Sequence, residues 1–319
     1  MPLLFASLSA HDCARDRNEN AHRIFSDPRA LAFWHLASLD APTVAVVWSL
    51  AFAWAGRVRL PLWVPLLLAL ATWAVYVGDR LLDALAGLRE PAQQTLRERH
   101  QFHWRYRRVL LPMAIAAACA AAGIIFAFMP PIARARDSVL AAAALAYFSG
   151  VHSRRTLWQL PLRWPRSFPG KEFLVGVLFT AGCVLPAWHR PHALAAPGSA
   201  IWVFWIPALA FVALAWLNCS CIERWEGVER PATCDNRSTQ SMRSIALALA
   251  IIDLVLCVLA AASAHPRPAA LLAAGGASAL LLALLDRNRA RFSALALRAA
   301  ADLVLLTPLA LIPLVWAAK

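Results

Sequence analysis

Residues 109–129 read VLLPMAIAAACAAAGIIFAFM, a run of twenty-one residues without a charged side chain. An α-helix needs about 20 consecutive apolar residues to cross the hydrocarbon core of a bilayer. Within that core, only a helix or a closed barrel satisfies its own backbone hydrogen-bonding groups. The run is longer than an ordinary strand of about 3–10 residues, so it predicts a transmembrane helix.

Similar apolar runs lie on both sides of this one, and the fourth is the weakest because Arg136 and Asp137 lie near its start. The nine predicted spans cover residues 37–55, 61–78, 109–129, 135–151, 172–188, 201–217, 244–262, 269–285 and 299–317. The chain is 61% hydrophobic and 15% charged, whereas soluble domains are about 45–50% apolar and about 25% charged. We therefore expect an all-α fold, a polytopic membrane protein with nine transmembrane helices. A soluble enzyme, a secreted disulfide scaffold and a disordered chain are excluded.

Basic residues alternate between the predicted loops. Loops 1–36, 79–108, 152–171, 218–243 and 286–298 hold 24 Lys and Arg residues, and the loops on the other side hold 6. The positive-inside rule then places the N-terminus in the cytoplasm and the C-terminus outside, in the inner (cytoplasmic) membrane. The net charge of +13 is read as this orientation signal, so nucleic acid is not an expected partner. We expect a cytoplasmic segment 1–36 and one membrane domain 37–317, compatible with four-helix halves 37–151 and 172–285 plus a ninth helix.

Acidic residues are scarce, and two of them close the second span. Asp79 and Asp83 are four residues apart, so they share one face of a helix. Paired carboxylates suit Mg²⁺, which prefers carboxylates, waters and substrate phosphates. The alternative interpretation is a solvated helix end that pairs with nearby arginines.

A second polar group follows the sixth span, four spans later. It comprises Asn218, Glu223 and Glu226, and the two glutamates can share a helix face. Because metal ligands in helical bundles come from facing helices, this group predicts a second metal-binding wall. The alternative is a charged loop paired with Arg224 and Arg230.

Basic and aromatic residues surround these acids. Arg80, Arg99, Arg154 and Lys171 lie near the acids or a span end and are candidates to bind a diphosphate. Trp73, Tyr76 and Tyr147 are candidates to line an apolar cavity and stabilise a carbocation, although helix packing alone also explains them.

Three acids lie within predicted spans, Asp40, Asp253 and Asp302. Ionisable groups inside a bilayer are costly and mark candidate functional sites. Asp40 and Asp302 lie near the cytoplasmic ends, where hydration is within reach. Asp253 lies near the centre of its span, so it should face the interior of the bundle, as in a proton-coupled transporter.

Nine spans with acidic motifs after the second and the sixth resemble the UbiA-type intramembrane prenyltransferase superfamily. The first motif of that family is N-D-x-x-D-x-x-x-D, and residues 75–83 read VYVGDRLLD. Asp79 and Asp83 match its last two acids, while Val75 and Tyr76 replace the leading Asn and Asp. The second motif contains two or three aspartates, whereas residues 218–226 read NCSCIERWE and contain glutamates instead.

The resemblance implies a UbiA-like helical bundle that moves an isoprenyl group from a prenyl diphosphate to an aromatic or lipid-like acceptor. It also implies Mg²⁺ as the cofactor, held by Asp79 and Asp83 together with Asn218, Glu223 and Glu226. The alternative is a transporter or lipid-binding membrane protein that keeps the fold without the chemistry. A CDP-alcohol phosphotransferase fits poorly, because its motif needs Asp-Gly and Ala-Arg pairs that are missing after Asp83.

Overall fold

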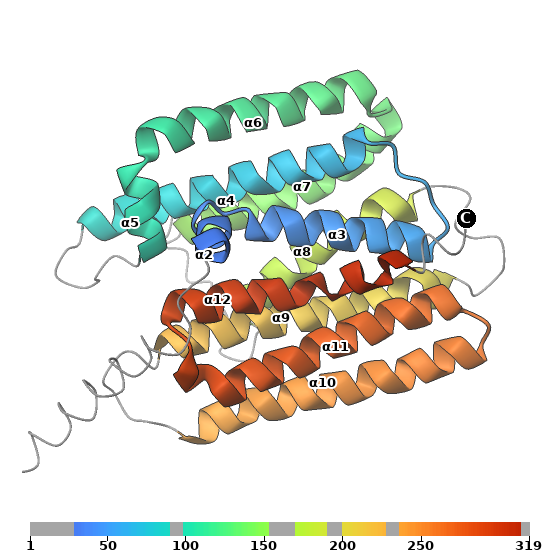
Figure 1. Cartoon of the computed structure of the whole chain (residues 1–319). Coiled ribbons are helices and arrows are strands. Elements are labelled where there is room, and N and C mark those ends of the chain that lie inside the picture. The colour runs from blue at the N-terminus through green and yellow to red at the C-terminus, as the bar shows by residue number, and fades with distance from the viewer. Residues whose placement is uncertain (1–28, 90–97, 153–169, 190–199, 228–235, 314–319) are drawn as a thin grey trace, which may run out of the picture.

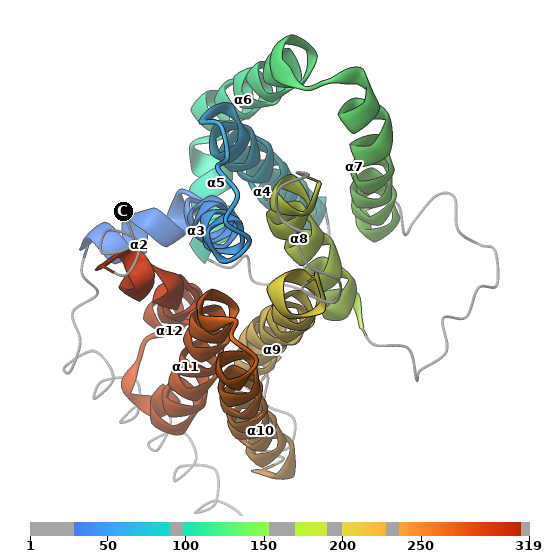
Figure 2. The ribbon, with the colours of Figure 1, turned by 90° about the vertical axis from the view of Figure 1, so that its right-hand side faces the viewer.

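The computed structural model describes residues 29–89, 98–152, 170–189, 200–227 and 236–313. Within these ranges every regular element is a helix and there is no strand, so the expected all-α class is confirmed. The long helices lie side by side with their axes roughly aligned, whereas the short α2 and α5 run across them (Figure 1). Viewed from the end, α6 and α7 lie at one side, α9 to α12 at the other, and α3, α4 and α8 between them (Figure 2).

The elements follow the predicted apolar runs, with added helical turns at several ends. The α-helices are α2 (Arg29–Leu36), α3 (Asp40–Ala55), α4 (Trp63–Arg89), α5 (Glu98–Arg105), α6 (Arg107–Phe128), α7 (Pro131–His152), α8 (Lys171–Trp188), α9 (Ile206–Gly227), α10 (Asn236–Ala262), α11 (Pro266–Asn288) and α12 (Ala294–Leu303). Three short helices of other types complete the described fold. They are the π-helix η2 (Ile201–Trp205) and the 3₁₀ helices η3 (Arg289–Arg291) and η4 (Val304–Leu311).

Within the described part of the chain, seven helical segments are long and apolar enough to cross a membrane. The number becomes eight when α2 and α3 are counted together as one bent span. Helix α7 is not among them, and its first two turns carry Arg134, Arg136 and Asp137. The expected count of nine spans is therefore not confirmed, and α7 corresponds to the run already predicted to be the weakest.

The first predicted span is bent rather than straight. Helices α2 and α3 meet at 90°, and Ser38 between them has a φ of 55°, in the left-handed region that non-glycine residues seldom occupy. The indole N–H of Trp73 on α4 donates to the carbonyl of Ala37 at 3.0 Å. The bend turns α2 across the bundle, where it packs against α12.

The last predicted span starts earlier than expected. We predicted residues 299–317, but α12 begins at Ala294 because the side chain of Ser293 caps it, accepting a hydrogen bond from the N–H of Ala296. The helix then tightens into η4, which contains Pro308. The earlier start brings Arg298, which we had placed in a loop, onto the helix with its side chain buried.

The core is centred on α3, which contacts α4, α8, α11 and α12. Trp48 is 2% exposed, and its ring stacks on Phe211 of α9 with centroids 3.9 Å apart. Its indole N–H donates to the carbonyl of Leu305 in η4 at 2.8 Å. Close packing and interhelical hydrogen bonds of this kind hold helices together in lipid, where apolar burial adds little. Because α3 lies at the centre of the bundle, it contributes lining residues to the cavity described below.

Candidate functional site

A cavity of about 280 Å³ lies at the end of the bundle where α3, α8 and α12 begin and α4 and α9 end, which we call the cavity end. Its polar lining consists of His35, Asp40, Tyr76, Arg80, Arg99, Tyr147, Lys171, Glu172, Asn218, Cys219, Glu223, Arg298 and Asp302. Its apolar lining consists of Ala41, Val44, Val175, Gly176, Phe179, Ala215, Ile222 and Leu305. Such a volume suits a small molecule or a ligand head group.

Nine of the residues singled out in the sequence meet in this cavity. They are Asp40, Tyr76, Arg80, Arg99, Tyr147, Lys171, Asn218, Glu223 and Asp302. They come from α3, α4, α5, α7, α8, α9 and α12, which span most of the sequence. The structure thus brings basic, acidic and aromatic side chains from separate helices to one end of the bundle.

The first acidic pair does not line the cavity. Asp79 and Asp83 share one face of α4, but Tyr76 and Arg80 occupy the neighbouring face that reaches the cavity. Oδ2 of Asp79 lies 3.7 Å from Nη1 of Arg80, and Oδ2 of Asp83 lies 3.7 Å from Nε2 of His100 on α5. Their side chains are 34% and 41% exposed. The short helix α5, which the sequence analysis did not predict, covers that face of α4.

Four other predicted residues lie elsewhere. Trp73 supports the bend between α2 and α3 and does not line the cavity. Asp253 is fully buried against Gly275 and Gly276 of α11, also away from the cavity. Arg154 and the side chain of Glu226 lie outside the part of the chain that the structure describes.

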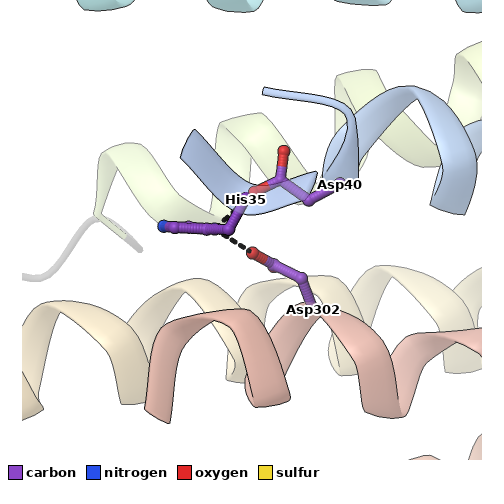
Figure 3. Close-up of side chains that lie close together, drawn as sticks. All are labelled: His35, Asp40 and Asp302. Atoms are coloured by element: carbon purple, nitrogen blue, oxygen red, sulfur yellow. Dashed lines mark ion pairs between the residues drawn. The ribbon is translucent and has the colours of Figure 1, made fainter. Parts of the chain in front are cut away.

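A buried cluster of His35, Asp40 and Asp302 forms one wall (Figure 3). Nδ1 of His35 lies 2.7 Å from Oδ2 of Asp40 and 3.5 Å from Oδ2 of Asp302. The Nδ2 amide of Asn218 donates to Oδ1 of Asp302 at 3.1 Å, and the backbone N–H of Ala41 donates to Oδ1 of Asp40 at 2.9 Å. Both ring nitrogens of His35 and Oδ1 of Asn218 are buried without a hydrogen bond of ordinary geometry to any described residue, so the contacts of Nδ1 with the two carboxylates are ion-pair contacts.

The bend between α2 and α3 puts His35 in this position. Besides the contact from Trp73, Oγ of Ser38 lies 3.2 Å from Nε2 of His103 on α5. His103 is fully buried, and burial lowers its pKa, as do the nearby guanidinium groups of Arg80 and Arg99. A lowered pKa favours the neutral imidazole, and its contact with Ser38 joins α5 to the bend that positions the cluster.

A second charged group lies at the cavity, where α8 and α9 face each other. Nζ of Lys171 lies 3.1 Å from Oε1 of Glu223 and 3.7 Å from Oε1 of Glu172. One cation thus draws carboxylates from two helices together. Hard carboxylate oxygens on facing helices are the donors that Mg²⁺ accepts, so this pair is the part of the lining that suits a magnesium ion.

The His35 cluster suits a metal less well. One ligand atom from each of His35, Asp40 and Asp302 lies within 4.8 Å of the others. However, a metal-bound histidine almost always donates its second ring N–H to a protein acceptor or water, and Nε2 of His35 meets no acceptor among the described residues. Both carboxylates instead approach Nδ1, which is how an acid orients a histidine for proton transfer.

Sequence reasoning missed His35 altogether and did not connect it with Asp40 and Asp302. The signal available was the presence of both acids at span ends on the same predicted side. It also missed Glu172, although this residue directly follows Lys171, and Arg298, because the start of α12 was placed too late. The omission of His35 concerns contacts between distant segments, whereas the omission of Arg298 comes from the local capping signal at Ser293.

Comparisons with protein-family models, curated protein sequences and solved structures gave no match. The proposals that follow therefore rest on the cavity itself and on the sequence resemblance.

Proposed function

We propose that the protein is an integral-membrane prenyltransferase, which moves an isoprenyl group from a prenyl diphosphate to an acceptor in this cavity. The observation that carries the proposal is the division of one cavity into a charged part and an apolar wall. Charged residues come from α3, α4, α5, α8, α9 and α12, while Val44, Phe179 and Leu305 supply apolar surface. An amphiphile with an anionic head and a hydrocarbon tail matches both parts.

The head group would meet four cations, Arg80, Arg99, Lys171 and Arg298. Arginine forks match phosphate oxygens in pairs, and lysine adds a point charge. Four acids, Asp40, Glu172, Glu223 and Asp302, balance them in formal charge. Because the protein groups alone leave the cavity near neutrality, a diphosphate needs an additional cation to enter it.

Glu172 and Glu223 are the residues that would hold Mg²⁺, since they converge on one ammonium group from α8 and α9. When bound, Mg²⁺ would supply charge neutralisation for the departing diphosphate. The predicted ligand Glu223 is thereby retained, with Glu172 as its partner. Asp79 and Asp83 lie outside the lining and take no part in this proposal.

The aromatic lining residues Tyr76, Tyr147 and Phe179 would face the allylic carbon as the bond to the diphosphate breaks. Aromatic faces attract a developing positive charge, and an enclosed wall keeps water from capturing it. We further propose that the cavity end faces the cytoplasm of the inner membrane. The support is the excess of basic residues in the loops at that end.

The test uses the full-length chain purified into lipid nanodiscs, with farnesyl diphosphate as the donor, Mg²⁺, and a panel of phenols as acceptors. Release of diphosphate and formation of prenylated product are measured together. Arg80→Gln is expected to lower the rate at least about 100-fold, which is the scale for removing one preorganised group that stabilises transition-state charge.

Arg136→Gln is the matched control. Arg136 is also an arginine beside a carboxylate, Asp137, but it lies on α7 at the far end of the bundle. It should leave the rate unchanged. The proposal fails if the wild-type chain neither binds farnesyl diphosphate nor releases diphosphate, or if the two variants behave alike.

A second candidate function is proton-coupled transport or lipid binding, and Asp253 is the observation that favours it. Both of its carboxylate oxygens are buried and lack a hydrogen bond within the described residues. A transporter of this kind would lose its proton coupling in Asp253→Asn and would be indifferent to Mg²⁺. Uptake of the substrate into proteoliposomes, with and without a pH gradient, separates this function from the transferase.

A further inference from the structure

We propose that His35 is the general base that removes the proton from an acidic hydroxyl group, such as that of a phenol, on the acceptor. The inference rests on the proposed transferase function for the role of that acceptor. It does not rest on it for the existence of the site, which can be tested without a prenyl donor.

The first argument is the orientation of the imidazole. Nδ1 lies 2.7 Å from Asp40 and 3.5 Å from Asp302, and both carboxylates approach the same edge of the ring (Figure 3). A carboxylate at ion-pair distance from one ring nitrogen favours the proton on that nitrogen. Nε2 is then left with its lone pair, which is the form of histidine that accepts a proton.

The second argument is the position of Nε2. His35 is 5% exposed, yet it lines the cavity, and Nε2 has no hydrogen-bond partner among the described residues. Buried polar atoms are nearly always paired in folded proteins. Because the side chain of His35 lines the cavity, a ligand bound there is within reach of the ring and can supply the missing hydrogen-bond donor. A hydroxyl group is such a donor.

The third argument is the charge around the ring. The charged and titratable groups that line the cavity around His35 are Asp40, Asp302, Arg80, Arg298, Tyr76 and Cys219. The two carboxylates would stabilise the imidazolium that forms when His35 takes the proton. The two guanidinium groups would stabilise the oxyanion that remains on the acceptor. Both products of the proton transfer thus have a counter-ion.

The chemistry balances without a further reactant. The acceptor oxygen forms a bond to C1 of the isoprenyl group, and the bond between C1 and the diphosphate oxygen breaks. The electron pair of the broken bond leaves with the diphosphate. The proton of the acceptor hydroxyl moves to Nε2 of His35, and it passes to water when the product leaves.

The test uses 4-nitrophenol, because its phenolate absorbs at a longer wavelength than the neutral phenol. The full-length chain in nanodiscs is added to the probe below the pH at which the free probe ionises. We expect a saturable phenolate band with the wild-type chain. We expect at least about a 100-fold weaker band with His35→Gln, on the scale of a catalytic proton transfer.

His189→Gln is the matched control, because His189 also lies beside a carboxylate, with Nδ1 3.5 Å from Oδ1 of Asp137. It follows α8 at the end opposite the cavity, so the phenolate band should be unchanged. If His35→Gln does not fold, ¹⁵N-histidine NMR of the wild-type chain decides instead. A proton on Nδ1 supports the proposal, and a neutral ring with its proton on Nε2 overturns it.

The remaining outcomes separate the two proposals. A phenolate band that depends on His35 without any prenyl transfer supports the base and rejects the transferase. Prenyl transfer without a phenolate band rejects the base and leaves the transferase standing. A tightly bound metal ion, found by elemental analysis of the purified chain and lost in His35→Gln, makes the cluster a metal site and overturns the base.

Discussion

Two pairs of acids lie at the same end of the bundle and differ in almost every other respect. Asp79 and Asp83 are one helical turn apart on α4, and their side chains are 34% and 41% exposed. Asp40 and Asp302 come from α3 and α12, and both approach one buried histidine. The first pair is conspicuous in the sequence, whereas only the folded chain brings the second together.

The difference lies in what surrounds each charge. Water screens half-exposed carboxylates, and their ion pairs contribute about 0–1 kcal/mol. Buried carboxylates interact through a medium of low dielectric constant, where a nearby charge acts more strongly. A motif recognised by spacing therefore says where acids are close in the chain. Burial decides how strongly each acid interacts with a neighbouring charge.

The comparison is tested most severely by matched substitutions in the two pairs. Asp40→Asn should lower prenyl transfer about 100-fold, because the ring of His35 loses the group that orients it. It should also reduce the 4-nitrophenolate band, which a purely structural role would not do in a chain that still melts normally. Asp83→Asn should change the rate by less than about three-fold, as expected for an exposed pair. The reverse order would restore Asp79 and Asp83 as the catalytic acids.

A smaller effect is expected from two glycines, one in the wall of the cavity and one on the outside of the bundle. A Cβ at Gly176 would lie 3.2 Å from the backbone N of Trp216 and O of Val212, so Gly176→Ala must push α8 away from α9. We expect a loss of about 1–3 kcal/mol in the free energy of unfolding. At Gly123 on α6 nothing lies within 4 Å, and alanine there should add about 0.5–1 kcal/mol through helix propensity. Denaturant titrations in detergent would measure both, and equal effects would contradict the close packing of α8 on α9.

Asp253 and Asp302 allow a comparison between two buried acids, one without and one with a hydrogen-bond partner among the described residues. Asp253 has no hydrogen-bond partner within the described residues, so Asp253→Ala should stabilise the fold by about 1 kcal/mol by removing an unsatisfied buried group. Asp302→Ala should instead destabilise it by about 1–3 kcal/mol, because Nδ2 of Asn218 loses its acceptor. Thermal melting monitored by circular dichroism would show opposite signs. A destabilised Asp253→Ala chain would mean that this acid has a partner that matters for folding.

The smallest expected effect concerns pH and His103. Burial lowers the pKa of this histidine in the folded chain, so the unfolded chain takes up a proton first as the pH falls below about 6.5. Stability from this residue is thus complete above that pH and declines below it. His103→Gln should flatten the decline by about 1 kcal/mol or less. Melting temperatures of the wild-type and His103→Gln chains, measured between neutral and mildly acid pH, would show the difference. If the two melting temperatures fall in parallel with pH, His103 makes no such contribution.

Much of the fold follows from local pattern. Uncharged runs such as residues 109–129 specify their helices without help from the rest of the chain. The structure departs from the pattern where one or two residues outweigh it. Ser293 starts α12 early by capping it. Arg136 and Asp137 make the start of α7 polar. The end of the bundle that carries the site was also predictable, because polar residues gather at span ends on one side.

The identity of the central residues was not predictable. The role of His35 depends on a 90° bend and on the approach of α12, and neither leaves a periodic signal. Asp79 and Asp83 lie on one face of α4, but it is the neighbouring face, with Tyr76 and Arg80, that meets the cavity. Hydrophobic periodicity tells which residues share a side of one helix. It does not tell how that helix is rotated against its neighbours.

The bend between α2 and α3 has a consequence for how the protein is made. His35 and Asp40 belong to the first part of the bundle that leaves the ribosome, and Asp302 belongs to the last helices. Chains emerge from their N-terminus onward, so His35 and Asp40 are synthesised before all the helices that separate them from Asp302. The cluster is complete only when α12 has been made. A chain interrupted shortly before α12 would hold most of its helices, but it would lack the second carboxylate of the cluster.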